Sequence, residues 1–177
     1  NGEANNIKIT FKNDITLNKT YFGIGFDVHR LIKNKKLYLG GVNIPFHSGL
    51  KGHSDGDVIL HAIIDAILGA IRKKDIGTYF PSNKNRFKNI RSPKMLKPII
   101  ESLYRNNFSI NNLDINLICE KPKVSVYRNR IINSISKLMD LDKNKINLKG
   151  KTVEKLGLIG KEKAIASEVI ISITKYD

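Results

Sequence analysis

The sequence predicts an α+β fold in which a mixed β-sheet of about four main strands is covered by helices. Strand-like segments alternate along the chain with segments of helical periodicity. Short turns near both ends indicate that some of the strands pair antiparallel. Neither an internal repeat nor a linker divides the 177 residues. We therefore predict one domain over residues 21–177, preceded by a polar N-terminal extension over residues 1–20.

The first half of the domain is expected to contain extended segments followed by a long helix. Residues 21–31 are predicted as a strand, and residues 37–46 as two short extended pieces around a Gly-Gly turn. A helix follows, with Ser54 or Asp55 as its expected N-cap and Asp57 in its first turn. Its apolar stripe recurs at helical spacing: Val58, Leu60, Ile63, Ile64, Ile67, Leu68 and Ile71.

The second half begins with a polar loop over residues 78–92. The helix that follows has Pro93 in its first turn, where proline is tolerated, whereas Pro98 is poorly compatible with its continuation. The predicted elements are a helix over residues 92–107, a strand over 113–121, a helix over 126–141 and strands over 146–153 and 164–176.

The charge of the chain indicates what kind of partner its surface suits. Lysine and arginine number 31 against 16 acidic residues, which gives a formal net charge of +15. The basic residues are scattered through turns and helix faces, without an arginine stripe or an aromatic stacking platform, so we do not expect a nucleic-acid partner. No apolar run is long enough to span a membrane. A basic surface does suit anionic substrates such as phosphates.

Two polar side chains at the first strand raise the question of a metal site. Asp27 and His29 lie one residue apart in GIGFDVHRL, so both project from the same face of extended chain. They form either a solvated edge or part of a metal site. His61, on the first helix, offers a third ligand, although Asp57 and Asp65 lie four residues away on either side and could satisfy its ring instead.

Three protein ligands with a fourth position open are typical of a catalytic zinc. In that arrangement Asp27, His29 and His61 would hold the ion, and Asp65 would hold the ring of His61.

Several segments resemble the 2-C-methyl-D-erythritol 2,4-cyclodiphosphate synthases of the non-mevalonate isoprenoid pathway. They are FDVHRL, then LGGVNIPFHSGLKGHSDGDVILHAIIDAILGAIRKKDIGTYFP, then EKLG. The resemblance is collinear from about Tyr21 to Lys175. It implies a metal-dependent phosphorus–oxygen lyase that cyclises 4-diphosphocytidyl-2-C-methyl-D-erythritol 2-phosphate with release of CMP. It also implies a homotrimer with active sites at the junctions of adjacent subunits.

The resemblance assigns roles to individual residues. Asp27, His29 and His61 match zinc ligands, and Glu154 matches the carboxylate that meets a second divalent ion, magnesium or manganese. His53 and Thr152 are expected at the reacting phosphates. The expected substrate-binding residues are Ser54 at the 2-phosphate, Asp75, Ile76, Gly77 and Phe80 around the erythritol part, Pro122 and Lys123 at the cytidine, and Thr152 and Lys161.

The expected chemistry relies on positioning and charge neutralisation. The 2-phosphate oxygen attacks the β-phosphorus while CMP leaves, so no covalent protein nucleophile is required. Backbone amides at the start of the first helix suit an anion, although an ordinary capped helix start is the alternative.

The chain departs from the family pattern at several positions. Ser82 stands where the family usually has aspartate, and Lys151 and Val153 replace two hydroxyl residues before Glu154. Leu158 and Lys161 stand where some members have an aromatic residue and an arginine lining a channel along the trimer axis. Because both differ, we do not carry over the binding of isoprenoid diphosphates in that channel. His47 is expected to be a solvated loop residue.

Three other functions remain open from the sequence. They are a trimeric scaffold that has lost catalysis, a zinc-dependent phosphohydrolase and a basic nucleic-acid binder. The single cysteine, Cys119, excludes a disulfide framework and suits a reducing compartment. We expect a plastid-type organelle (apicoplast or chloroplast stroma) if an upstream transit peptide has been removed, and the cytoplasm otherwise.

Overall fold

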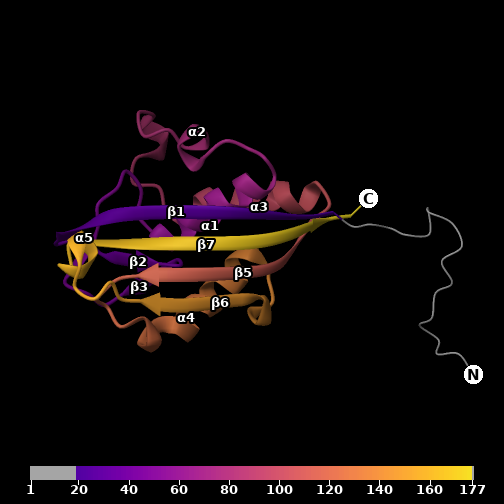
Figure 1. Cartoon of the computed structure of the whole chain (residues 1–177). Coiled ribbons are helices and arrows are strands. Elements are labelled where there is room, and N and C mark those ends of the chain that lie inside the picture. The colour runs from indigo at the N-terminus through magenta and orange to yellow at the C-terminus, as the bar shows by residue number, and fades with distance from the viewer. Residues whose placement is uncertain (1–18, 177) are drawn as a thin grey trace, which may run out of the picture.

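The computed structural model describes residues 19–176, which fold into a five-stranded sheet with the three long helices on one side (Figure 1). The sheet has the strand order β4-β1-β7-β5-β6. The predicted extension over residues 1–20 lies outside the described residues, except for its last two positions. These two residues, Lys19 and Thr20, belong to the first strand.

Four long strands form most of the sheet, as the sequence predicts. They are β1 (Lys19–Lys33), β5 (Phe108–Ile118), β6 (Ile146–Lys151) and β7 (Ala164–Lys175). β7 pairs antiparallel with both β1 and β5, while β6 lies parallel to β5. The parallel pair is joined through helix α4 (Val124–Met139), because parallel neighbours need a crossover connection.

Several short elements complete the fold. The predicted extended pieces form a separate two-stranded sheet, β2 (Leu37–Leu39) with β3 (Val42–Ile44), and β4 (Ser48–Leu50) adds a fifth strand beside β1. The one-turn helices α2 (Ile76–Tyr79) and α5 (Gly157–Gly160) were not predicted; α2 runs into the predicted loop over residues 78–92, and α5 lies between the last two predicted strands. Two 3₁₀ turns span Asn85–Phe87 and Lys143–Lys145.

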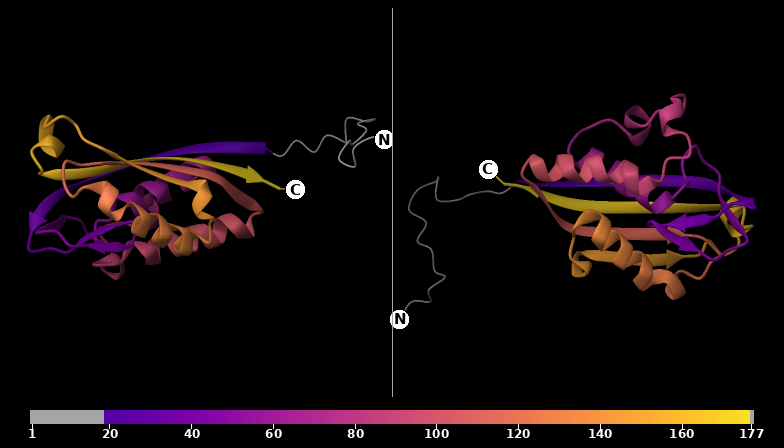
Figure 2. Two further views of the ribbon diagram at one scale, coloured as in Figure 1. Left: turned by 90° about the horizontal axis from the view of Figure 1, so that it is seen from below. Right: turned by 180° about the vertical axis from the view of Figure 1, so that it is seen from behind.

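The core lies between the sheet and the helices α1 (Val58–Ala70), α3 (Ser92–Arg105) and α4 (Figure 2). α1 packs directly on β1 because the strand presents glycine at two contact positions. A Cβ on Gly23 would come within 1.9 Å of the carbonyl oxygen of Ala66, and one on Gly25 within 1.9 Å of that of Ala62. The missing side chains therefore set the spacing between helix and strand.

Two details of the helices differ from the sequence prediction. The N-cap of α1 is Asp57, not Ser54 or Asp55, because its carboxylate accepts hydrogen bonds from the Ile59 and Leu60 amides. α3 continues through Pro98. Its buried apolar face outweighs the hydrogen bond that this proline cannot donate; that face consists of Met95, Leu96, Ile99, Ile100 and Leu103.

The sheet face opposite the three long helices exposes a row of large apolar side chains. From β1 these are Phe22, Ile24, Phe26 and Val28, which are 71%, 63%, 57% and 47% exposed, and β7 adds Ile170 at 49%. We call this row the apolar sheet face. Within residues 19–176, none of the helices combines the length and apolar character that a membrane crossing requires.

Candidate metal centre

β1 and α1 bring the three predicted ligands together at one point. The Oδ2 atom of Asp27 lies 3.0 Å from Nε2 of His29 and 2.9 Å from Nδ1 of His61. The two ring nitrogens are 3.3 Å apart. Asp27 and His29 are neighbours on the helix-facing side of β1, and the close glycine contact holds α1 against that side. The three residues form a group that could hold a metal ion.

The second nitrogen of each ring has its own partner, which determines the nitrogen left for a metal. Nδ1 of His29 lies 2.7 Å from the carbonyl oxygen of Lys51 and must donate to it, since a carbonyl only accepts. Nε2 of His61 lies 3.1 Å from Oγ of Ser54 and 3.0 Å from Oγ of Ser92. The nitrogens that face Asp27 are therefore the ones available to an ion.

Asp65 does not hold the ring of His61 as predicted. Its Oδ1 accepts a hydrogen bond of 2.7 Å from the Ile76 amide, so it anchors the start of α2. The other candidate for this ring, Asp57, is occupied by the Gly40 and Gly41 amides and by the first turn of α1. Both carboxylates lie four residues from His61, which is a helical spacing, but in the structure each accepts hydrogen bonds from backbone amides instead.

The electrostatics of the group favour an ionised carboxylate beside two imidazoles. Burial alone would raise the pKa of Asp27, but the hydrogen bonds and positive charge of His29 and His61 lower it to about 2. For His29, burial lowers the pKa. The hydrogen bond and charge of Asp27 raise it by more than burial lowers it, so the net shift of the pKa is upward. The group therefore attracts a cation, either a proton or a metal ion.

The donor atoms lie slightly closer together than the ligands of a bound zinc. Ligand atoms about 2.0–2.2 Å from a tetrahedral zinc lie roughly 3.3–3.6 Å apart, against 2.9–3.3 Å here, so a small outward shift of the side chains would accommodate the ion. Two imidazoles and one carboxylate leave a fourth position open.

A cavity of about 240 Å³ adjoins the metal group. The predicted residues His53, Ser54, Ile76, Gly77 and Phe80 line it, together with the three candidate ligands. Asp75 is not part of its wall, because its carboxylate caps α2 by accepting from the Thr78 amide at 2.8 Å.

Further wall residues were missed by the sequence reasoning. They are Phe87, Ile90 and Met95; Ser82, noted from the sequence only as a departure from the family pattern, also lines the cavity. Phe87 and Ile90 stand in a polar loop without periodicity, where only their hydrophobicity could have indicated them, and Met95 was expected only as part of a helix.

A second cavity, of about 410 Å³, is lined by the predicted cytidine residues Pro122 and Lys123. Thr152, predicted near the diphosphate, lines it too, as do Cys119 and Lys151. Cys119 is buried, and burial raises the pKa of its thiol to about 12, which makes it an unreactive core residue.

Glu154 lies in a tight turn beside this second cavity. Its φ of 51° and that of Lys155, 61°, are both in the left-handed region. One carboxylate oxygen of Glu120 accepts from the Val153 amide at 3.1 Å and from the Lys155 amide at 3.2 Å, which holds the turn. The hydroxyl of Thr152 donates to Glu154 at 3.1 Å, so these two predicted residues are together. Lys161 is exposed at the end of α5.

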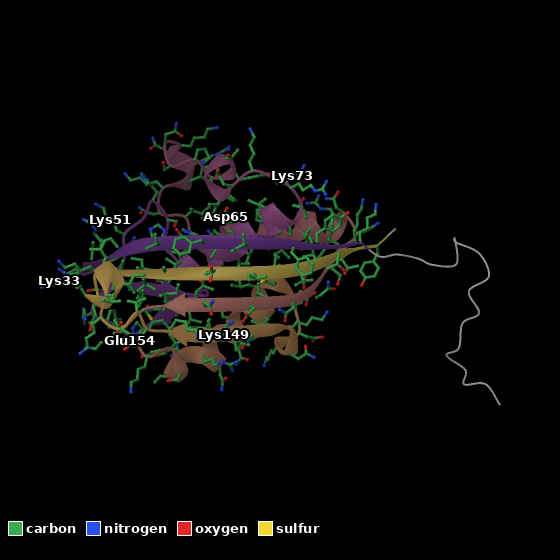
Figure 3. All side chains as sticks on the ribbon, in the orientation of Figure 1. Lys33, Lys51, Asp65, Lys73, Lys149 and Glu154 are labelled. Atoms are coloured by element: carbon green, nitrogen blue, oxygen red, sulfur yellow. The ribbon has the colours of Figure 1, made fainter. Side chains whose placement is uncertain are left out.

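The two cavities are separate within one chain. Asp27 is paired in register with Ser167, Ser167 with Leu117, and Leu117 with Gly150. Three strand spacings place Asp27 and Gly150 roughly 14 Å apart across the sheet. In Figure 3, Glu154 accordingly lies near the end of β6, whereas Asp65 and Lys51 lie on the β1 side. His47, expected to be solvated, is exposed in the loop before β4.

Comparisons with known proteins agree on one family. The model of the YgbB family matches residues 20–174. A 2-C-methyl-D-erythritol 2,4-cyclodiphosphate synthase of Caldicellulosiruptor bescii is 45% identical over 151 residues, which are 85% of this chain and 96% of that protein. A solved structure of IspF from Plasmodium falciparum in complex with CDP has a TM-score of 0.79 and 40% identity, over 92% of this chain and all of that one.

Some relatives are longer. A bifunctional enzyme IspD/IspF of Pelagibacter ubique is 56% identical over 177 residues, and the match covers 99% of this chain but 48% of that protein. The chain therefore spans about half the length of this relative.

Proposed function

Because this chain belongs to the YgbB family of 2-C-methyl-D-erythritol 2,4-cyclodiphosphate synthases, we propose that its own residues carry out the cyclisation step of the non-mevalonate isoprenoid pathway. The reaction converts 4-diphosphocytidyl-2-C-methyl-D-erythritol 2-phosphate to the 2,4-cyclodiphosphate and releases CMP. The observation that carries the proposal is the group of Asp27, His29 and His61 in the wall of a cavity.

Zinc is the proposed ion at this group, held by Asp27 Oδ2, His29 Nε2 and His61 Nδ1. When bound, it would supply a Lewis acid for a β-phosphate oxygen at its open position. The single carboxylate would neutralise only part of the charge of a bound zinc ion, so the site would stay positive and attract an anionic substrate.

His53 and Ser54 are the proposed contacts of the attacking 2-phosphate. Both line the cavity beside the metal group, and Ser54 lies just before the start of α1, whose first amides are capped by Asp57. Phe80 and Met95 line the same cavity and suit the carbon skeleton of the erythritol. Ile76 and Gly77 place α2 against it, and Asp75 holds that helix start.

The second cavity is the proposed cytidine and diphosphate end of the site. Pro122 and Lys123 would contact the nucleoside, and Thr152 the diphosphate. Glu154 would hold a magnesium or manganese ion that neutralises charge on the departing CMP. Lys161, exposed at the end of α5, would add positive charge at this end.

A homotrimer would combine these two cavities into complete sites. They lie apart within one chain, so a substrate with phosphates at one end and cytidine at the other is best served by cavities of adjacent subunits. The apolar sheet face supports the same assembly, since such a row of large exposed side chains is typical of a contact surface. Closed cyclic symmetry buries it in every copy.

A CMP-release assay, together with zinc analysis, tests the proposal. The purified chain should release CMP from the diphosphocytidyl substrate and contain about one zinc per chain. His61→Ala should lose both zinc and CMP release. His47→Ala, which alters an exposed histidine outside both cavities, is the matched control and should keep both.

Three results would contradict this function. Retention of stoichiometric zinc by His61→Ala would show that the metal site is misassigned. Release of inorganic phosphate in place of CMP would favour a phosphohydrolase, and full zinc without either product would favour a scaffold.

A further inference from the structure

Nε2 of His61, the ring nitrogen that faces away from Asp27, lies between two buried serines that differ in their further hydrogen-bond partners. Ser54 and Ser92 approach Nε2 at 3.1 and 3.0 Å, so distance alone does not distinguish them. Ser92 is fully buried and Ser54 is 8% exposed. Only Ser92 continues to a carboxylate, because its hydroxyl donates to Oδ1 of Asp55.

Asp55 is held in one orientation by other groups. Its Oδ2 accepts from Nε of Arg91 at 2.8 Å and from the Ser92 amide at 3.1 Å. The guanidinium of Arg91 lies 3.7 Å above the ring centre of Tyr38, which fixes it in turn. Oδ1 of Asp55 is therefore left facing the hydroxyl of Ser92.

These contacts determine which atom donates in each hydrogen bond from Asp55 through Ser92 to His61. An ionised carboxylate only accepts, so the hydroxyl proton of Ser92 is committed to Asp55. A lone pair of Ser92 then faces His61, and the nitrogen opposite it must carry the proton. With Nε2 protonated, the neutral ring presents the lone pair of Nδ1 toward Asp27 and His29.

The same reasoning leaves the hydroxyl of Ser54 free to donate elsewhere. Its oxygen already accepts from the Gly56 amide at 3.1 Å. Its proton cannot go to Nε2, which is itself a donor, so it can turn into the cavity that Ser54 lines.

We propose that Asp55, acting through Ser92, is a positioning group that fixes the tautomer of His61 for metal binding and so leaves the Ser54 hydroxyl to donate to the anionic substrate. The inference rests on the proposed metal site at Asp27, His29 and His61. Asp55 and Ser92 touch neither metal nor substrate, and their effect passes through His61.

Zinc affinity of matched serine variants tests this assignment. Competition against a chelator of known affinity should show that Ser92→Ala binds zinc about 10- to 100-fold more weakly than the unaltered protein. Ser54→Ala should keep zinc affinity within about twofold and instead raise the KM for the substrate, because it loses a substrate contact. Equal losses of zinc affinity in both variants, or none in Ser92→Ala, would overturn the proposal.

Asp55→Asn provides a second measurement that does not depend on Ser92. The asparagine oxygen should take the place of Oδ2 beside Arg91, which turns its NH₂ group toward Ser92. Ser92 then has to donate to His61 and forces the proton onto Nδ1, where it competes with zinc. We expect a loss of affinity at least as large as in Ser92→Ala.

Nitrogen-15 NMR of the zinc-loaded protein reads the tautomer directly. The unaltered protein and Ser54→Ala should show a slowly exchanging proton on Nε2 of His61, and Ser92→Ala a rapidly exchanging one. Absence of this proton from the unaltered, zinc-loaded protein would refute the tautomer assignment while leaving the metal site intact. Absence of zinc binding by the unaltered protein would instead refute the metal site and this inference together.

Discussion

At the scale of single residues, Asp27 and His29 form a pair that either a proton or a metal ion can complete. The raised pKa of His29 means that the metal-free protein keeps its proton longer than an isolated imidazole would. By linkage, this pair adds stability below about pH 6.5, and that stability is lost as the pH rises through the raised pKa. Zinc needs the deprotonated ring, so its effect on stability runs in the opposite direction.

The stabilisation by zinc should therefore increase with pH. The difference in melting temperature between zinc-loaded and chelator-treated protein should grow from about pH 6 to about pH 8.5, as protons stop competing. Thermal unfolding across this range provides the measurement. His29→Gln removes the titrating ring, so the stability of the metal-free variant should no longer decline as the pH rises through this range. An undiminished decline would show that another group causes it.

At the scale of elements, β1 and α1 determine the site because they carry all three ligands. The sequence predicted this helix from its apolar stripe and the strand from its run of extended residues, so the triad could be identified before the structure. The role of Ser92 could not, since a serine 31 positions after His61 has no local signal of contact. β4, α2 and α5 were missed because three or four residues are too few to show periodicity.

Gly25→Ala should disrupt the contact between these elements. The added methyl would meet the carbonyl oxygen of Ala62 at 1.9 Å, so helix and strand must separate. We expect the free energy of unfolding to fall by about 1–3 kcal/mol or more, with weakened zinc binding. Chemical denaturation measures the first effect and chelator competition the second.

Gly69→Ala, on helix α1 opposite β1, is the matched control. A Cβ there has its nearest neighbour at 3.7 Å, and alanine favours a helix by up to about 1 kcal/mol over glycine. Stability should be unchanged or higher. A comparable loss in both variants would show that the close contact is not the cause.

Glu120 should position the turn that carries Glu154. Glu120→Ala removes the acceptor of two amides, so the left-handed turn loses its support. A metal titration of turnover should show a requirement for magnesium or manganese raised on the order of tenfold, with zinc content unchanged. Glu120→Gln keeps a side-chain carbonyl and should restore most of the response; an equal shift in both variants would remove Glu120 from this role.

At the scale of the whole molecule, the apolar sheet face and the two separate cavities are the observations behind the proposed homotrimer. The net charge of +15 is large enough to resist random association, so apolar contact would have to outweigh repulsion between the proposed subunits. The location of the protein in a plastid-type organelle or the cytoplasm stays a prediction from the sequence.

Ile24→Lys should weaken this assembly. A lysine at this exposed position would have to lose its water in the contact of the proposed homotrimer, so the assembly should dissociate with loss of activity. Light scattering at micromolar concentration measures the mass. Val126→Lys, at an equally exposed apolar residue on α4, should leave the mass unchanged; a trimer that persists in Ile24→Lys would place the interface elsewhere.

The roughly 14 Å between Asp27 and Gly150 across the sheet has a genetic consequence. In the proposed site shared by adjacent subunits, a defect near β1 and a defect near β6 would damage different halves, so two inactive chains should complement one another. Co-expressed His61→Ala and Glu154→Gln chains that mix at random should regain about one quarter of the normal activity, because about one junction in four joins two intact halves. Each variant alone should stay inactive, and a mixture without recovery would mean that every site is built from a single chain.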